Sequence, residues 1–136
     1  MGLQKYHLYD RLSELFTGMY EAASAFPIYR LPELFSGFKK GAYNIPVKYP
    51  VACSPQAWSA GTIPYMLIAA LGLTPDALNN QLMLVKPHLP PWLNKVHITD
   101  LRIGKASVDM EFRREESGTL VNVVKKHGEL DVFIEY

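Results

Sequence analysis

The sequence predicts an α+β fold in which helices come first and strands follow. In the first half of the chain, apolar residues recur every three to four positions, the period of an amphipathic helix. From residue 82 onward they alternate with polar residues, the period of a strand with one buried face. The 136 residues are 49% hydrophobic and 20% charged, a globular composition. We therefore expect two long helices joined by a long loop, followed by a small antiparallel β-sheet.

The first helix is expected from about Leu3 to Ala25, with Pro27 preventing its continuation. Charged residues fall between the apolar ones, so one face is suited to packing against a core. The apolar residues at helical spacing are Leu8, Leu12, Leu15, Phe16, Met19, Tyr20 and Ala23.

Residues 28–53 follow neither period and contain several prolines and glycines. A connection of this length is uncommon in a compact domain and is often functional. Its last residue, Cys53, is the single cysteine of the chain, and we expect it to be packed. One thiol forms no internal disulfide, which fits a reducing compartment, and we expect a cytoplasmic protein.

The second helix is expected over Pro55–Leu71. Ser54 is a suitable N-cap, and proline suits the first helical position. Gly72 can end the helix, and Pro64 is expected to kink it. Apolar residues occupy every side of this segment, which predicts a helix that is buried all round.

The second half of the chain is expected to form short strands joined by tight turns, as an antiparallel meander with one polar face. Gly104-Lys105 and Ser117-Gly118 mark two of the turns. The chain therefore divides into a helical hairpin with its loop, residues 1–73, and a β tail, residues 82–136. The expected strands cover residues 82–85, 96–103, 106–113, 119–126 and 130–135.

The composition argues against several classes of function. A net charge of +1 gives no electrostatic case for binding nucleic acid or an anionic membrane. The N-terminus lacks the apolar core of a signal peptide, and the longest apolar stretch, Ile63–Leu73, is too short to span a bilayer. The histidines and the cysteine show no metal-ligand spacing, and no glycine pattern for phosphate binding is present. We expect neither a metal nor a cofactor.

The carboxylate of Glu33 is the main candidate for a functional group. It lies in the apolar, proline-containing stretch Arg30–Gly37, upstream of a second motif at Cys53–Ser59. A lone acid in an apolar frame beside an aromatic loop is typical of carbohydrate-cleaving sites. The alternative is structural, because Pro32-Glu33 could open a helical turn whose dipole favours a carboxylate.

Four further residues are candidate sugar contacts. Gln56 could form hydrogen bonds from the first turn of the second helix. Trp58 could stack on a sugar ring, although its apolar helix favours a position in the core. Arg30 and Tyr49 lie beside or within the long loop, where such side chains either bind sugars or pack the loop.

Two motifs resemble the C-terminal end of the bacterial glycogen-debranching-type, amylo-α-1,6-glucosidase-like glycoside hydrolases. The first runs from Tyr29 to Phe38, and the second from Tyr49 to Ser59. Pro87–Leu93 and Leu101–Gly104 also resemble the end of that family, so the resemblance covers nearly the whole chain. The pairing of the first two motifs at this spacing is its most specific part.

The resemblance implies an (α/α)6 barrel, of which this chain would supply the last hairpin and the β tail. It implies that Glu33 is the general base of an inverting hydrolase acting on α-glucan-like substrates. The general acid of that family is an aspartate on an earlier barrel segment, and this chain starts after that point. The resemblance thus implies little hydrolysis by this chain alone. It also implies a partner, either an upstream barrel subunit or further copies in a homo-oligomer.

A non-catalytic interaction module is the alternative. The apolar faces of the second helix would then mediate oligomerisation, or the aromatic loop would hold an oligosaccharide without cleaving it. The two interpretations differ in what covers the second helix. An independent module would cover it with its own residues, whereas part of an assembly would need another chain.

Overall fold

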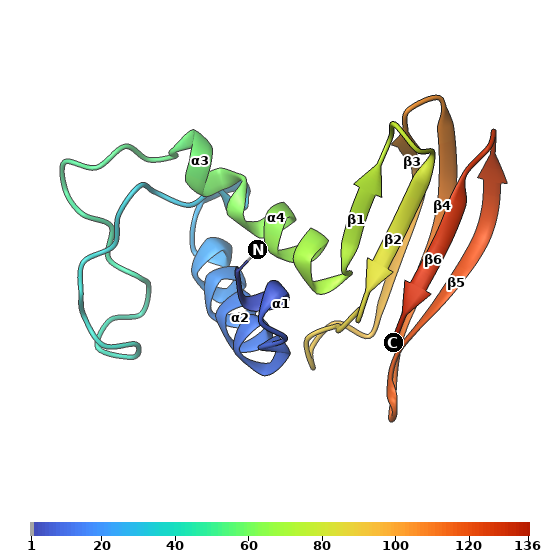
Figure 1. Ribbon diagram of the computed structural model, residues 1–136. Coiled ribbons are helices and arrows are strands. Elements are labelled where there is room, and N and C mark those ends of the chain that lie inside the picture. Colours follow the sequence, from blue (N-terminus) through green and yellow to red (C-terminus); the bar gives the residue numbers. More distant parts are fainter. Residues whose placement is uncertain (1) are drawn as a thin grey trace. The chain divides into compact units, whose positions relative to one another are not determined.

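A computed structural model describes residues 2–136, and within them the fold is α+β (Figure 1). The helices occur in the first half of the chain and the six strands in the second. The chain forms two compact units, one of residues 14–67 and one of residues 68–136 with the first thirteen residues. The first unit contains the long loop, and the second contains all six strands.

The first predicted helix is interrupted. It consists of α1, Gly2–Lys5, and α2, Tyr9–Ser24, separated by a short turn. His7 in this turn has a φ of 57°, a left-handed conformation that an α-helix does not contain. The 16-residue α2 is amphipathic as predicted. The buried residues of its apolar face include Leu12, Phe16 and Ala23.

The second predicted helix starts later than expected. Ser54 does not cap it, and Pro55 lies in the loop. Gln56 is the N-cap of α3, Ala57–Ala60, and its Oε1 accepts a hydrogen bond from the Ala57 N–H at 3.2 Å. This bond satisfies one of the backbone N–H groups that the start of a helix leaves unpaired.

The predicted helix is also broken in two at Gly61, where a single kinked helix was expected. The second part, α4, covers Thr62–Ala70. Pro64 explains the break, because it has no N–H for the carbonyl four residues earlier and its ring crowds that carbonyl. Gly72, with a φ of 68°, follows the end of α4 as predicted. A Cβ atom there would collide with the Val85 carbonyl, so the position requires glycine.

The α3–α4 segment is not buried on all sides, contrary to the prediction. Met66 and Ala69 are buried, but Trp58 is 89% exposed and Tyr65 is about half exposed. The two long helices of the prediction are thus one 16-residue helix and one broken helical segment. Within residues 2–136, none of the helices has the length and apolarity needed to cross a membrane.

The six strands within the described residues form two three-stranded sheets (Figure 1). The first sheet has the strand order β1-β2-β6, and the second has the order β3-β4-β5. The first contains one antiparallel and one parallel pair, whereas the second is antiparallel throughout. The strands are β1, Leu73–Asp76; β2, Gln81–Val85; β3, Lys95–Ile103; β4, Ala106–Glu115; β5, Gly118–His127; and β6, Asp131–Glu135.

The first sheet departs from the predicted meander, because β6 pairs in parallel with β2 instead of continuing beside β5. Two backbone bonds support this placement. The Asp131 N–H donates to the Asn80 carbonyl at 2.9 Å, and the Lys86 N–H donates to the Glu135 carbonyl at 2.7 Å. Strand β1 was not predicted, since Pro75 lies within it; as an edge strand, β1 tolerates a proline.

The second sheet follows the predicted alternation. In β4, Val108, Met110 and Phe112 are fully buried, while the residues between them are partly exposed. Tight turns join β3 to β4 and β4 to β5 close to the predicted positions. Leu82 and Leu84 of β2 are also fully buried, so both sheets contribute to the core of this unit.

Replacing Met110 with alanine tests the position of the core. Met110 is fully buried, so Met110→Ala is expected to lower the free energy of unfolding by about 2–5 kcal/mol through lost burial and a cavity. Met83 is the matched control, since it lies in β2 and is 43% exposed. Met83→Ala is expected to cost less than about 1 kcal/mol. Urea unfolding followed by circular dichroism measures both, and equal losses would contradict this assignment of the core.

A charge cluster on β3 and β4 predicts acid sensitivity. Hydrogen bonds from Lys95 and then Arg113 hold the pKa of the Glu111 carboxyl below its usual value. Because the folded-state pKa is lowered, this stabilisation is present above the unfolded-state pKa and is lost as the pH falls through the folded-state pKa. Glu111→Gln is therefore expected to lose less stability than the unmodified chain between about pH 5 and pH 2.

Urea unfolding across that pH range measures the difference. Glu129→Gln, at the turn between β5 and β6, is the control for removing one acidic group from the same unit. The cluster would be excluded as a source of stability if Glu111→Gln and Glu129→Gln showed the same pH dependence.

Candidate functional site

The long loop folds back on itself so that its two ends run side by side. A β-bridge pairs Phe35 with Lys48, and backbone hydrogen bonds extend the pairing in both directions. We call residues 31–36 and 47–56 the paired segments. Their bonds are Ser36 N–H to Val47 O at 2.8 Å, Tyr49 N–H to Leu34 O at 3.0 Å, Glu33 N–H to Cys53 O at 2.9 Å, and Gln56 N–H to Leu31 O at 3.1 Å.

Glu33 is held through both its backbone and its side chain. Its N–H donates to the Cys53 carbonyl at 2.9 Å, and its Oε2 accepts from the Cys53 N–H at 3.2 Å. Leu31 and Pro32, directly before it, are buried and anchor the segment. These described residues are not helical, so Glu33 does not open a helical turn, which was the structural alternative. The residue is exposed, and its Oε1 is available for a second hydrogen bond.

Cys53 is exposed rather than packed, contrary to the prediction. Cys53 contributes to the candidate site through its backbone, because both its N–H and its carbonyl form hydrogen bonds with Glu33. Backbone groups are common to every residue, so this role leaves no signal in the sequence.

Two of the predicted sugar contacts, Arg30 and Gln56, line one open hollow of about 640 Å³. This volume lies in the range of ligand-binding clefts. The Gln56 Oε1 accepts the Ala57 N–H, which leaves the side-chain NH₂ group for a ligand. The remaining lining residues are Ile28, Tyr29, Pro55, Ala57, Ala60, Ile63 and Pro64.

Two residues that line this hollow have a strained backbone conformation. Ile28 and Tyr29 have φ values of 56° and 54°. A left-handed conformation is unusual for bulky or β-branched residues, and such strain concentrates at functional sites. The Tyr29 ring stacks on the ring of Tyr20, with centroids 6.4 Å apart and planes 10° apart. No property of the sequence at Ile28 predicts this conformation.

Trp58 and Tyr49 lie outside the lining of the hollow. Trp58 is almost fully exposed, so its interpretation as a core residue is wrong. Tyr49 is about half exposed. Its N–H donates to the carbonyl of Leu34, the residue that follows Glu33. Within residues 2–136, the hollow is lined by no Asp or Glu, and no group of three or more His, Cys, Asp or Glu side chains is arranged to hold a metal ion.

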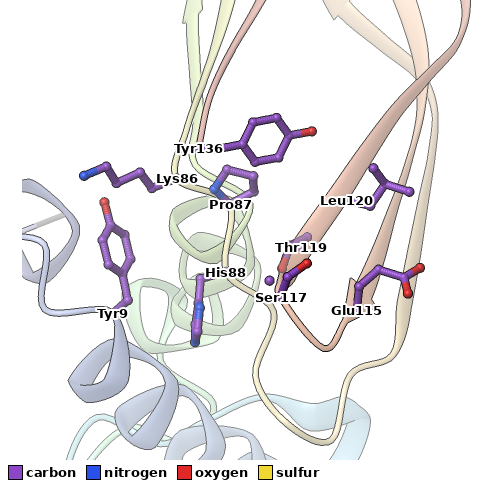
Figure 2. A pocket seen from close by; sticks show the side chains of 10 residues that line it. Tyr9, Lys86, Pro87, His88, Glu115, Ser117, Thr119, Leu120 and Tyr136 are labelled. Carbon is purple, nitrogen blue, oxygen red and sulfur yellow. The ribbon is translucent and has the colours of Figure 1, made fainter.

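The unit that contains the sheets has a separate hollow of about 330 Å³ (Figure 2). Figure 2 shows Tyr9 and His88 on one side of Pro87 and the turn between β4 and β5 on the other. The Tyr9 and His88 ring centroids are 6.2 Å apart. Burial, and secondarily the Glu135 carboxylate, raise the pKa of the Tyr9 phenol. None of the site residues predicted from the sequence lines this hollow.

Comparison with known proteins gives no match, whether the chain is compared with protein-family models, with curated proteins or with solved structures. The paired segments and the adjoining hollow are therefore the observations that bear on function.

Proposed function

We propose that this chain is the C-terminal portion of a glycogen-debranching-type inverting glycoside hydrolase for α-glucan-like carbohydrate, with Glu33 as the general base. The observation that supports this most strongly is the reciprocal pair of bonds between Glu33 and Cys53. The two motifs that resemble this family are separated in the sequence, and these bonds bring them together around one carboxylate. A purely structural acid at a helix start would need no contact with the second motif.

The geometry of Glu33 suits a base that acts on water. The Cys53 N–H holds Oε2 and orients the carboxylate, while Oε1 is left to accept a hydrogen bond from a water molecule. An inverting hydrolase places its base about 6.5–9.5 Å from the general acid, so that the attacking water fits between substrate and base. In this proposal the acid comes from an earlier part of the barrel.

The substrate would be held by the residues that surround the paired segments. Arg30 and Gln56 provide hydrogen-bond donors in the hollow, which suit the hydroxyl groups of a sugar. Trp58 and Tyr49 present exposed aromatic rings outside it. Ligand clefts combine apolar and aromatic surface with a few polar groups in this way.

Exposed apolar residues support assembly with a further barrel segment or another chain. Trp58, Val51 and Ile28 belong to the loop-containing unit, and each is at least 80% exposed. Large exposed apolar side chains mark interaction surfaces when they form a patch. An upstream barrel subunit would cover such residues and also bring the general acid, whereas a homo-oligomer would only cover them. The free thiol of Cys53 suits a reducing compartment, and we place this assembly in the cytoplasm.

A non-catalytic carbohydrate-binding or oligomerising module is the second candidate. It is favoured by the hollow, in which Arg30 and Gln56 are present but, among the described residues, no carboxylate. Such a site would hold a sugar without cleaving it. The two candidates differ in whether Glu33 takes part in chemistry or only holds the paired segments together.

The direct test of the proposed function adds a second chain that carries the general acid. The chain is combined with the barrel portion of a debranching-type enzyme, and the release of glucose from a limit dextrin is measured. Hydrolysis is expected to appear on combination. Glu33→Gln is expected to lower kcat by roughly 10²- to 10⁴-fold, because an amide cannot accept the proton from water. Nuclear magnetic resonance of the fresh product should show the inverted anomer.

Glu116→Gln, at the turn between β4 and β5, is the matched control and should retain full activity. Hydrolysis that survives Glu33→Gln would exclude Glu33 as the base. If the combined chains bind the dextrin but never hydrolyse it, the non-catalytic module is the better description.

A further inference from the structure

An aromatic groove lies between the tip of the long loop and α2. It has a volume of about 580 Å³, and residues within 35–47 and within 18–25 line it. Both segments belong to the same compact unit as Glu33. We call this site the tip groove. Among its lining residues is Tyr43, one of the aromatic residues of the long loop.

Phe38 and Tyr43 form an exposed ring pair in the tip groove. Their centroids are 4.9 Å apart and their planes meet at 60°, a tilted contact that aromatic pairs favour. Phe38 is 56% exposed and Tyr43 is 54% exposed, so each ring supports the other while both remain open to a ligand. Phe35, which also lines the groove, is in turn supported by Phe26 at 5.7 Å.

The polar residues of the tip groove suit a ligand that is rich in hydroxyl groups. Lys40 and Glu21 form an ion pair, so this cation and this carboxylate of the lining neutralise each other. Lys39 adds one further cation and hydrogen-bond donor to the lining. Asn44 and Ser36 add an amide and a hydroxyl group, which can both donate and accept hydrogen bonds. A pyranose ring offers an apolar C–H face for an aromatic ring and a rim of hydroxyl groups, so it matches both parts of the groove.

The first paired segment connects the tip groove to Glu33. Phe38 follows Glu33 by five residues, so their Cα atoms lie at most about 18 Å apart. The backbone between them is fixed by the bridge of Phe35 and by the bond of Ser36 to the second paired segment. A ligand that reached both places would be a chain of several sugar rings rather than a single ring.

We propose that the tip groove binds an oligosaccharide chain by stacking a pyranose ring on Phe38 or Tyr43. The choice of an α-glucan as the ligand rests on the proposed function. The groove would extend the contact of such a chain beyond the hollow at Arg30 and Gln56. It contributes affinity for longer chains and takes no part in the chemistry at Glu33.

Calorimetric titration of the full chain with maltose and with maltoheptaose tests this site. Maltoheptaose is expected to bind more tightly than maltose. Phe38→Ala and Tyr43→Ala are each expected to weaken maltoheptaose binding by roughly three- to tenfold, the loss of one aromatic contact. Tyr43→Phe keeps the ring and should retain most of the affinity. Phe133→Ala is the matched control, because this ring is 48% exposed on β6 in the other unit.

Three results would overturn the tip groove as a sugar site. The first is the absence of maltoheptaose binding, and the second is an equal effect of Phe38→Ala and Phe133→Ala. The third is a change of oligomeric state in Phe38→Ala, measured by light scattering, with no change in sugar affinity, since the groove would then be a protein contact. Failure of the tip groove is distinguishable from failure of the proposed function. If only the tip groove is wrong, hydrolysis that depends on Glu33 would persist in Phe38→Ala. If only the proposed function is wrong, maltoheptaose binding would persist without any hydrolysis.

Discussion

The reciprocal contact between Glu33 and Cys53 is the constraint on which the loop-containing unit depends. A connection as long as residues 28–53 would lose much conformational entropy on folding unless its own ends supplied the compensating bonds. Here the paired segments supply them, and the buried Leu31 and Pro32 anchor one of the two. The same contact aims one carboxylate oxygen at the Cys53 N–H and leaves the other open to solvent. The pairing that stabilises the loop therefore also orients the carboxylate of Glu33.

Two hollows lie at opposite ends of the paired segments. The hollow at Arg30 and Gln56 follows the bond between the Gln56 N–H and the Leu31 carbonyl, whereas the tip groove lies beyond the bridge of Phe35. Their linings differ, because the hollow contains a guanidinium and an amide, whereas the groove presents a pair of exposed rings. The exposed Trp58 adds an apolar surface, which the proposed barrel segment would cover. Under the proposed function, this chain would contribute one carboxylate and part of a sugar-binding surface to a larger site.

Features that depend on local pattern could be predicted from the sequence, whereas features that depend on distant partners could not. The alternation over Ala106–Arg113 identified β4 and its buried face, since the period alone determines which side chains share a face. Strand β6 is equally regular, but its pairing with β2 depends on a partner that no local pattern specifies. The apolar pattern around Trp58 predicted burial, yet burial depends on which neighbours are present. In the candidate site, the apolar frame indicated Glu33 as a candidate residue, whereas the contact with Cys53 uses backbone groups that leave no trace in the sequence.

The most direct test of the central claim is amide hydrogen exchange at Cys53, measured by nuclear magnetic resonance. The Cys53 N–H donates to Glu33 Oε2, so its exchange should be slow in the unmodified chain. Glu33→Gln retains an acceptor oxygen and should preserve much of the protection, whereas Glu33→Ala should abolish it. Fast exchange at Cys53 in the unmodified chain, or equal protection in Glu33→Ala, would contradict the account. Either result would mean that the two motifs are not joined around the Glu33 carboxylate.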